Sequence, residues 1–277
     1  MIPIFVGGTG RSGTTILQQY LSIHSQISSS NPPEIKILTD EGGLLDLYEN
    51  KNINNFEEYI YKIKKQTENG YYAFINSIED EKINNLINEL KNNFYQNPQE
   101  FIKNFYFNLF EEKNHYMCDS SPSTIQNAHK INKLFFNSKF IHMSRDGRDS
   151  AYSDYEAMKN NKFYHHIKTP FDALDVWHKR IIQSFQSLNL IEKDKYINVR
   201  LEDLTVYNRE FEKNKILNFL SIENENKMES FFNNQIKKER MSLGKWKNTK
   251  YAEDFNKKYD EILNDLKDKD IFIEKFY

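Results

Sequence analysis

A glycine-rich stretch near the start of the chain, GGTGRSGTT at residues 7–15, constrains the fold more than any other feature. It follows IPIFVGG (2–8), a short apolar run of β-forming residues that predicts a buried strand. It precedes TTILQQYLSIH (14–24), in which apolar side chains recur at helical spacing, at Ile16, Leu17, Tyr20 and Leu21. A strand, a glycine loop and a helix in this order indicate an α/β fold whose first loop meets a ligand.

Three further apolar runs predict strands, at 115–121, 139–145 and 196–200, and helical patterns separate them. Strands that alternate with helices favour a central parallel sheet flanked by helices on both faces. The sequence shows no internal repeat and no linker rich in Pro, Gly or Ser. We therefore expect one domain over residues 1–277.

The stretch from about 40 to 112 is helical in pattern. One of its segments begins with Asn97 as a cap and Pro98 at the first helical position. Two interpretations stay open for this stretch: a helical lid over the edge of the sheet, where an acceptor would bind, or ordinary structural packing.

The charge of the chain is balanced, with 38 Lys and Arg against 40 Asp and Glu. This balance argues against a nucleic-acid partner and confines any anion site to a local cluster. Cys118 is the only cysteine, which excludes an intramolecular disulfide and a thiolate zinc site. The sequence has no signal-peptide pattern and no apolar run long enough to span a membrane, so we expect a soluble, cytoplasmic protein.

The glycine stretch has the frame of a phosphate-binding loop without its lysine. Gly8 and Gly13 match G-x-x-x-x-G, but Thr14 stands where a Walker motif has lysine. Backbone N–H groups at the start of the next helix still favour an anion. With Arg11 inside the loop and hydroxyls at Ser12, Thr14 and Thr15, the loop suits an anion shorter than a triphosphate. A glycine turn without a ligand is the alternative.

A second cluster lies in HMSRDGRDSAYSDY, residues 142–155. Arg145 ends a predicted strand, and Ser153 falls on the helix after it, so the two could clamp a phosphate at the carboxyl edge of the sheet. The alternative is a turn with a surface salt bridge among its charged residues, Arg145, Asp146, Arg148 and Asp149.

Taken together, these motifs resemble those of the sulfotransferase family. GRSGTT (10–15) resembles the family's 5′-phosphosulfate loop, and SRDGRDSAYS (144–153) resembles its 3′-phosphate motif. VRLEDL (199–204) is similar to a family strand and turn, and LGKWKN (243–248) to the C-terminal loop that closes on the nucleotide. The opening stretch and RDGR are most similar to the tyrosylprotein branch and its bacterial relatives.

The resemblance implies a sulfotransferase fold related to P-loop NTPases. It also implies 3′-phosphoadenosine-5′-phosphosulfate (PAPS) as donor, adenosine 3′,5′-bisphosphate (PAP) as product, and no metal. The group is transferred to a hydroxyl or amine by in-line displacement. The implied nucleotide-binding residues are Gly10, Arg11, Ser12, Gly13, Thr14, Thr15, Arg145, Ser153, Leu201, Gly244, Lys245 and Trp246.

Two residues are expected to act in catalysis. Glu34, in SNPPEIKIL (30–38), matches the glutamate that serves as base in the tyrosylprotein branch, and Arg11 would balance charge on the leaving side. A plain surface carboxylate is the alternative for Glu34. His165 and His166, in a predicted loop, are the rival bases, whereas His24 and His142 are interpreted as structural.

Two departures from the branch pattern leave alternatives open. Ser120, in CDSSP, replaces a lysine near the reaction centre, and Gly244 replaces a serine. A P-loop kinase using ATP, and a non-catalytic protein of the same fold that binds PAP or PAPS, are the other candidate functions. The acceptor is open among a polysaccharide, a lipid, a small metabolite and a peptide tyrosine, and the sequence leaves the oligomeric state undecided.

Overall fold

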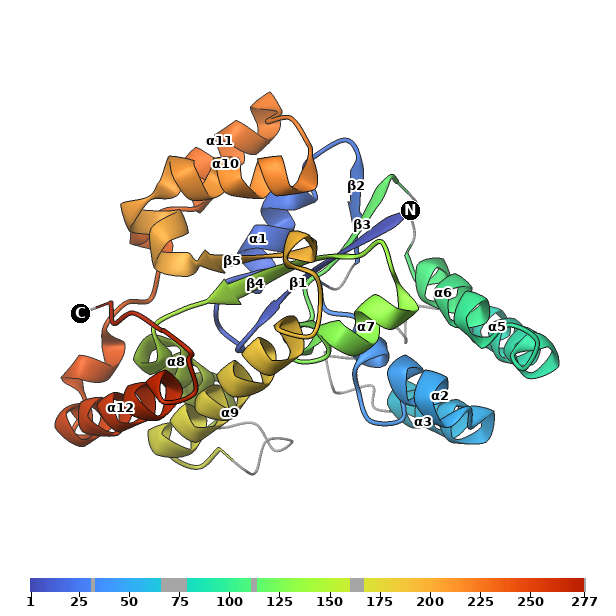
Figure 1. The fold of residues 1–277 in the computed structure, drawn as a ribbon, viewed down its shortest axis with the longest axis horizontal. Coiled ribbons are helices and arrows are strands. Elements are labelled where there is room, and N and C mark those ends of the chain that lie inside the picture. The colour runs from blue at the N-terminus through green and yellow to red at the C-terminus, as the bar shows by residue number, and fades with distance from the viewer. Residues whose placement is uncertain (31–32, 66–78, 111–113, 160–166, 277) are drawn as a thin grey trace.

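The computed structural model describes residues 1–276 except 31–32, 66–78, 111–113 and 160–166, and it is built around one twisted parallel sheet (Figure 1). Along the sheet the strands are β2 (Ile27–Ser29), β3 (Tyr116–Asp119), β1 (Ile2–Gly8), β4 (Lys139–Ser144) and β5 (Tyr196–Arg200). All four strand pairings of this sheet are parallel. The predicted fold class, a parallel sheet flanked by helices, is confirmed.

Helices cover both faces of the sheet because the side chains of each strand alternate between two apolar clusters. Ile4 and Val6 pack towards α1 (Thr14–Leu21), α10 (Arg209–Leu220) and α11 (Asn226–Gln235). Phe5, between them in sequence, packs on the opposite face. The helices of that side are α2 (Leu44–Asn50), α3 (Ile53–Lys65), α5 (Asp80–Asn93), α6 (Pro98–Asn108) and α7 (Ala128–Leu134).

A third apolar cluster joins α8 (Gly147–Met158), α9 (Pro170–Leu188) and α12 (Ala252–Lys267). These helices lie together at the end of the sheet towards which β4 points (Figure 1). The start of α9 is fixed by a capping box between Thr169 and Asp172. Helix α8, which carries the second predicted phosphate motif, is therefore held between two long helices.

The helical stretch from 40 to 112 contributes to the core. Asn97 caps α6 by accepting a hydrogen bond from the Glu100 N–H, with Pro98 at the first helical position, as expected. The apolar faces of α2, α3, α5 and α6 are buried in the cluster that contains Phe5. This packing accounts for the helical pattern, while the acceptor-binding lid stays a prediction.

Two local elements were not predicted from the sequence. Strand β2 was missed because three residues are too few to show the alternation of a strand. A short 3₁₀ turn, Pro122–Thr124, precedes α7. Among the described residues, no helix is long and apolar enough to cross a membrane.

The substitution Phe5→Ala tests how much the packing of the central strand β1 contributes to stability. Its ring is fully buried and lies 5.4 Å, centroid to centroid, from the ring of Phe140 on β4. Phe5→Ala should lower the free energy of unfolding by about 3–5 kcal/mol, because it leaves a cavity in a closely packed core. Denaturant unfolding measures this change. Phe272→Ala is the control, since its ring is 71% exposed, and it should change stability by no more than about 0.5 kcal/mol. Equal effects of the two substitutions would contradict the assignment of Phe5 to the core.

Candidate active site

The candidate site is a cavity of about 900 Å³ at the carboxyl edge of the sheet. Each described strand contributes lining residues from the segment that follows it. Arg11 follows β1, Glu34 follows β2, Ser123 follows β3, Arg145 follows β4 and Leu201 follows β5. Ligands of open α/β sheets bind at this edge, so the cavity lies where the sequence predicted it.

The glycine loop after β1 forms one wall of the cavity. Gly13 has φ +93°, a conformation that favours glycine, and a Cβ placed there would lie 2.7 Å from Leu201 Cδ1, so a side chain would also have to displace that leucine. It precedes α1, whose first N–H groups have no acceptors within the helix. Gly10, Arg11, Thr14 and Thr15 also line the cavity. The loop therefore lines the cavity with hydroxyls and with the first backbone donors of α1, and its binding of an anion remains a prediction.

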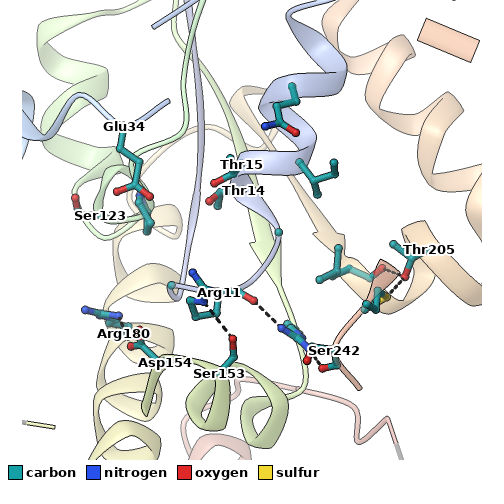
Figure 2. Close-up of a pocket in the computed structure, with 18 of the residues that line it drawn as sticks. Arg11, Thr14, Thr15, Glu34, Ser123, Ser153, Asp154, Arg180, Thr205 and Ser242 are labelled. Carbon is teal, nitrogen blue, oxygen red and sulfur yellow. Dashed lines mark hydrogen bonds and ion pairs between the residues drawn. The ribbon is translucent and has the colours of Figure 1, made fainter. Parts of the chain in front are cut away.

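The two predicted phosphate motifs meet at Arg11. Its Nε donates a hydrogen bond to Ser153 Oγ at 3.1 Å, and Arg145 donates to the Arg11 carbonyl at 3.0 Å (Figure 2). Arg145 is only 6% exposed, and its second terminal nitrogen donates to the carbonyl of Ser242. An ion pair of this turn joins Arg148 and Asp146, and it is buried, so it is not the surface salt bridge of the alternative interpretation.

Glu34 points into the cavity from the segment after β2 (Figure 2). Burial raises the pKa of its carboxyl, and the charge of Asp119 adds to this rise, whereas Lys36 and Arg11 oppose it. The Lys36 ammonium lies 3.7 Å from Glu34 Oε2 and lines the same cavity. A carboxyl with a raised pKa inside a cavity is a candidate for a general base, and this role of Glu34 remains a prediction.

Several lining residues were missed by sequence reasoning. These include Lys36, which pairs with Glu34, and Asp40, Asp154 and Arg180; Arg180 lies 3.6 Å from the Asp154 carboxylate, next to Gly10 of the glycine loop. Asp154 directly follows Ser153, which was a usable signal. Arg180 lies within the long helix α9 and no local pattern distinguishes it. Further along the chain, the lining residues that were missed are Thr205, Gln235, Ile236, Lys237, Arg240, Met241 and Ser242.

The predicted C-terminal loop residues do not line the cavity. The Gly244 N–H donates to Asp149 at 2.7 Å, and Lys245 is exposed. Trp246 is buried beside Arg148, whose guanidinium lies 4.7 Å from the indole ring. Their role in nucleotide binding remains a prediction, as does that of Ser12, which is fully buried beneath the loop.

The histidines fall into two groups. His142 is buried in β4, where Nδ1 lies 2.9 Å from Asn198 Oδ1, and burial lowers its pKa to about 4. His24 is buried three residues beyond α1 and accepts a hydrogen bond from the Gln26 N–H. Both positions agree with structural roles. The rival bases His165 and His166 lie outside the described residues. In the part of the chain that the structure describes, no cluster of three or more His, Cys, Asp or Glu could hold a metal ion.

Comparison with known proteins points to one family. A sequence profile described as the sulfotransferase family matches residues 3–226. The fold is similar to that of sulfotransferase STF9 from Mycobacterium avium, with 13% identity, a TM-score of 0.56, and coverage of 99% of this chain and 78% of the other. It is also similar to mouse sulfotransferase SULT7A1 complexed with PAP, with 14% identity, a TM-score of 0.51, and coverage of 97% and 86%. The sulfotransferase domain of the Synechococcus PCC 7002 olefin synthase gives 17% identity, a TM-score of 0.50, and coverage of 94% and 86%.

The raised pKa of Glu34 predicts how Glu34→Gln changes stability with pH. Below the ordinary value of 4.5 both folded and unfolded chains carry a neutral Glu34. As the pH rises from 4.5 through the raised folded pKa, the unfolded chain ionises first, so the wild type alone loses stability. The free energy of unfolding of the variant relative to wild type should therefore increase across this window and then level off.

Denaturant unfolding at a series of pH values measures this difference. Glu57→Gln is a matched control, because Glu57 has similar exposure and also pairs with a lysine, far from the cavity. A Glu34→Gln difference that stays flat between about pH 4 and 8 would show that the carboxyl is not desolvated.

Proposed function

The chain belongs to the sulfotransferase family, and from this premise we propose that it transfers the sulfuryl group of PAPS to a hydroxyl or amine of an acceptor. The observation that carries the proposal is the contact between the two phosphate motifs, in which Arg11 bonds Ser153 and accepts from Arg145. The complex of the similar mouse sulfotransferase with PAP supports a 3′-phosphorylated nucleotide as the ligand.

The lining residues suggest how the donor lies. The 5′-phosphosulfate occupies the loop of Gly10–Thr15, where backbone N–H groups and Arg11 stabilise its charge. Its 3′-phosphate lies between Arg145 and Ser153. The adenine end lies against Leu201 and the segment that ends at Ser242, and Ser242 is labelled on the right in Figure 2. A nucleotide triphosphate would lack the lysine that its outer phosphates require, because Thr14 occupies that position.

Glu34 acts as the base. It accepts the proton of the acceptor hydroxyl while the acceptor oxygen forms its bond to sulfur and the bond from sulfur to the donor phosphate oxygen breaks. Arg11 stabilises the negative charge that develops on that phosphate oxygen, and PAP leaves. The raised pKa of Glu34 brings its basicity closer to neutral pH than that of an exposed carboxylate.

The end of the cavity around Glu34 would receive the acceptor. The described lining of the cavity carries Lys36 and Asp40 on the segment of Glu34, and Arg180 and Asp154 next to Gly10 of the glycine loop. Burying a purely apolar acceptor against these charges costs free energy, whereas hydroxyl groups form hydrogen bonds with them. We therefore favour a hydrogen-bonding acceptor.

Transfer of ³⁵S from labelled PAPS into a host-cell extract, followed by identification of the labelled product, tests the reaction and finds the acceptor.

Arg145→Ala should weaken binding of PAP about 10- to 100-fold, because the variant loses charged hydrogen bonds to the 3′-phosphate. Isothermal titration calorimetry with PAP measures the affinity. Arg200→Ala is the control, since Arg200 does not line the cavity and pairs with Glu274, and its PAP affinity should stay within about twofold of wild type. Equal affinities of Arg145→Ala and wild type for PAP would remove the basis of the donor site.

A titration of the wild-type protein with ATP and Mg²⁺ tests the kinase alternative, which predicts tighter binding of ATP than of PAP.

Glu34→Gln should lower the rate of ³⁵S transfer about 10²- to 10⁴-fold while leaving PAP affinity nearly unchanged, because it removes the base and not the donor site. Glu57→Gln, away from the cavity, should transfer at the wild-type rate. Undiminished transfer by Glu34→Gln would show that another group accepts the proton. Tight PAP binding without transfer to any component of the extract would favour a non-catalytic protein.

A further inference from the structure

We propose that Asp119 and Ser120, at the end of β3, are positioning residues that hold Glu34 in the cavity through the main chain on either side of it. This inference rests on the proposed role of Glu34 as the base. It also assigns a function to Ser120, which stands where the tyrosylprotein branch has a lysine.

The residue before Glu34 is held by its carbonyl. The Pro33 carbonyl accepts a hydrogen bond from Ser120 Oγ at 2.8 Å and from the Ser120 N–H at 3.1 Å. Ser30 Oγ donates to the same oxygen at 3.0 Å. Gln18 Nε2, from α1, lies 3.2 Å from the Ser30 carbonyl and 3.5 Å from the Pro33 carbonyl. Donors from three separate segments thus converge on one acceptor directly before the base.

The residue after Glu34 is held by Asp119. The Ile35 N–H lies 3.5 Å from Asp119 Oδ1, which also accepts from the N–H and hydroxyl of Ser121 at 2.8 and 2.6 Å. Asp119 Oδ2 accepts from the Tyr106 hydroxyl at 2.8 Å. Asp119 and Ile35 are fully buried. The Asp119 carboxylate is therefore a rigid acceptor, since both of its oxygens are engaged.

These contacts restrain a short segment whose own structure is irregular. Glu34 lies in neither helix nor strand, and its side chain is 26% exposed. A base on such a segment would sample many positions unless its neighbours were anchored, and loss of about 1 Å in placement reduces catalysis strongly. Tyr106 belongs to α6, and its hydroxyl donates to Asp119. The helical stretch between 40 and 112 therefore helps to hold Asp119, and through it the segment of Glu34.

The same contacts keep the Glu34 carboxyl partly desolvated. Lys36 on its own segment, Asp119 on β3 and Arg11 on the loop after β1 are the charged groups that act on it. If the Pro33 anchor were loosened, the segment would move towards water and the pKa of Glu34 would fall towards its ordinary value. A purely structural serine would have no such effect on Glu34.

Ser120→Ala and Gln18→Met test the anchor, and the control is Ser28→Ala. Ser28 is also a buried serine, and its hydroxyl has no hydrogen-bond partner among the described residues. The pKa of Glu34 is read by ¹³C NMR on protein labelled at the glutamate carboxyl, with the Glu34 signal assigned by its loss in Glu34→Gln. Both test variants should lower this pKa relative to wild type, and Ser28→Ala should leave it unchanged.

Sulfate release from ³⁵S-PAPS, with water as the acceptor, gives the second readout. Ser120→Ala should reduce kcat about 5- to 20-fold, as expected for loss of a hydrogen bond that orients the base, and should leave KM for PAPS and PAP affinity within about twofold. An unchanged pKa and kcat in both test variants would overturn the positioning role. If Ser120→Ala lowers the pKa but Glu34→Gln releases sulfate at the wild-type rate, the anchor stands and the assignment of Glu34 as base fails.

Discussion

The parallel direction of the strands is the constraint on which this site depends. Because the pairings of the described sheet are all parallel, every strand delivers its following segment to the same edge. β1 lies between β3 and β4, so the glycine loop is placed at the middle of that edge. Residues more than a hundred positions apart, such as Arg11 and Ser153, become hydrogen-bonded neighbours without any sequence motif that joins them. The chemistry of the cavity is thus a consequence of topology before it is one of individual side chains.

The arginines of the site differ from a structural arginine in the partners that orient them. Arg148 is buried against the carboxylate of Asp146, and its charge is neutralised locally. Arg145 is held by the carbonyls of Arg11 and Ser242, and Arg11 is held by the hydroxyl of Ser153. Neutral dipoles fix the direction of a guanidinium without cancelling its charge. A chain of nearly zero net charge can therefore keep uncancelled arginine charge at this cavity.

The parts of the site that could be predicted from sequence are those encoded within a few residues. The loop from Gly10 to Thr15 was recognisable because a strand and a helix flank it, and Arg145 and Ser153 because they share one turn and helix. Arg180 could not be recognised from the sequence, since only the packing of α9 brings it to the cavity. The lining residues from Gln235 to Ser242 were also not predicted, since the sequence pointed to Gly244, Lys245 and Trp246, whose role stays a prediction. The conformation of an irregular loop is set by residues distant in the sequence. Here Arg145 donates to the Ser242 carbonyl and Asp149 accepts from the Gly244 N–H, and neither contact can be predicted from the local sequence.

The serine at position 120 shows how charge and geometry near a base can be separated. The lysine expected there would have been fixed to β3, independently of the base. In this chain the cation close to Glu34 is Lys36, two residues along the same segment and 3.7 Å from the carboxylate. One short stretch of backbone thus carries both Glu34, the proposed base, and this cation. Ser120 bonds the Pro33 carbonyl of the same stretch, so the proposed anchor acts on both groups, which a lysine side chain could not do through charge alone. The positive charge beside the proposed base is therefore carried by the segment of Glu34 itself.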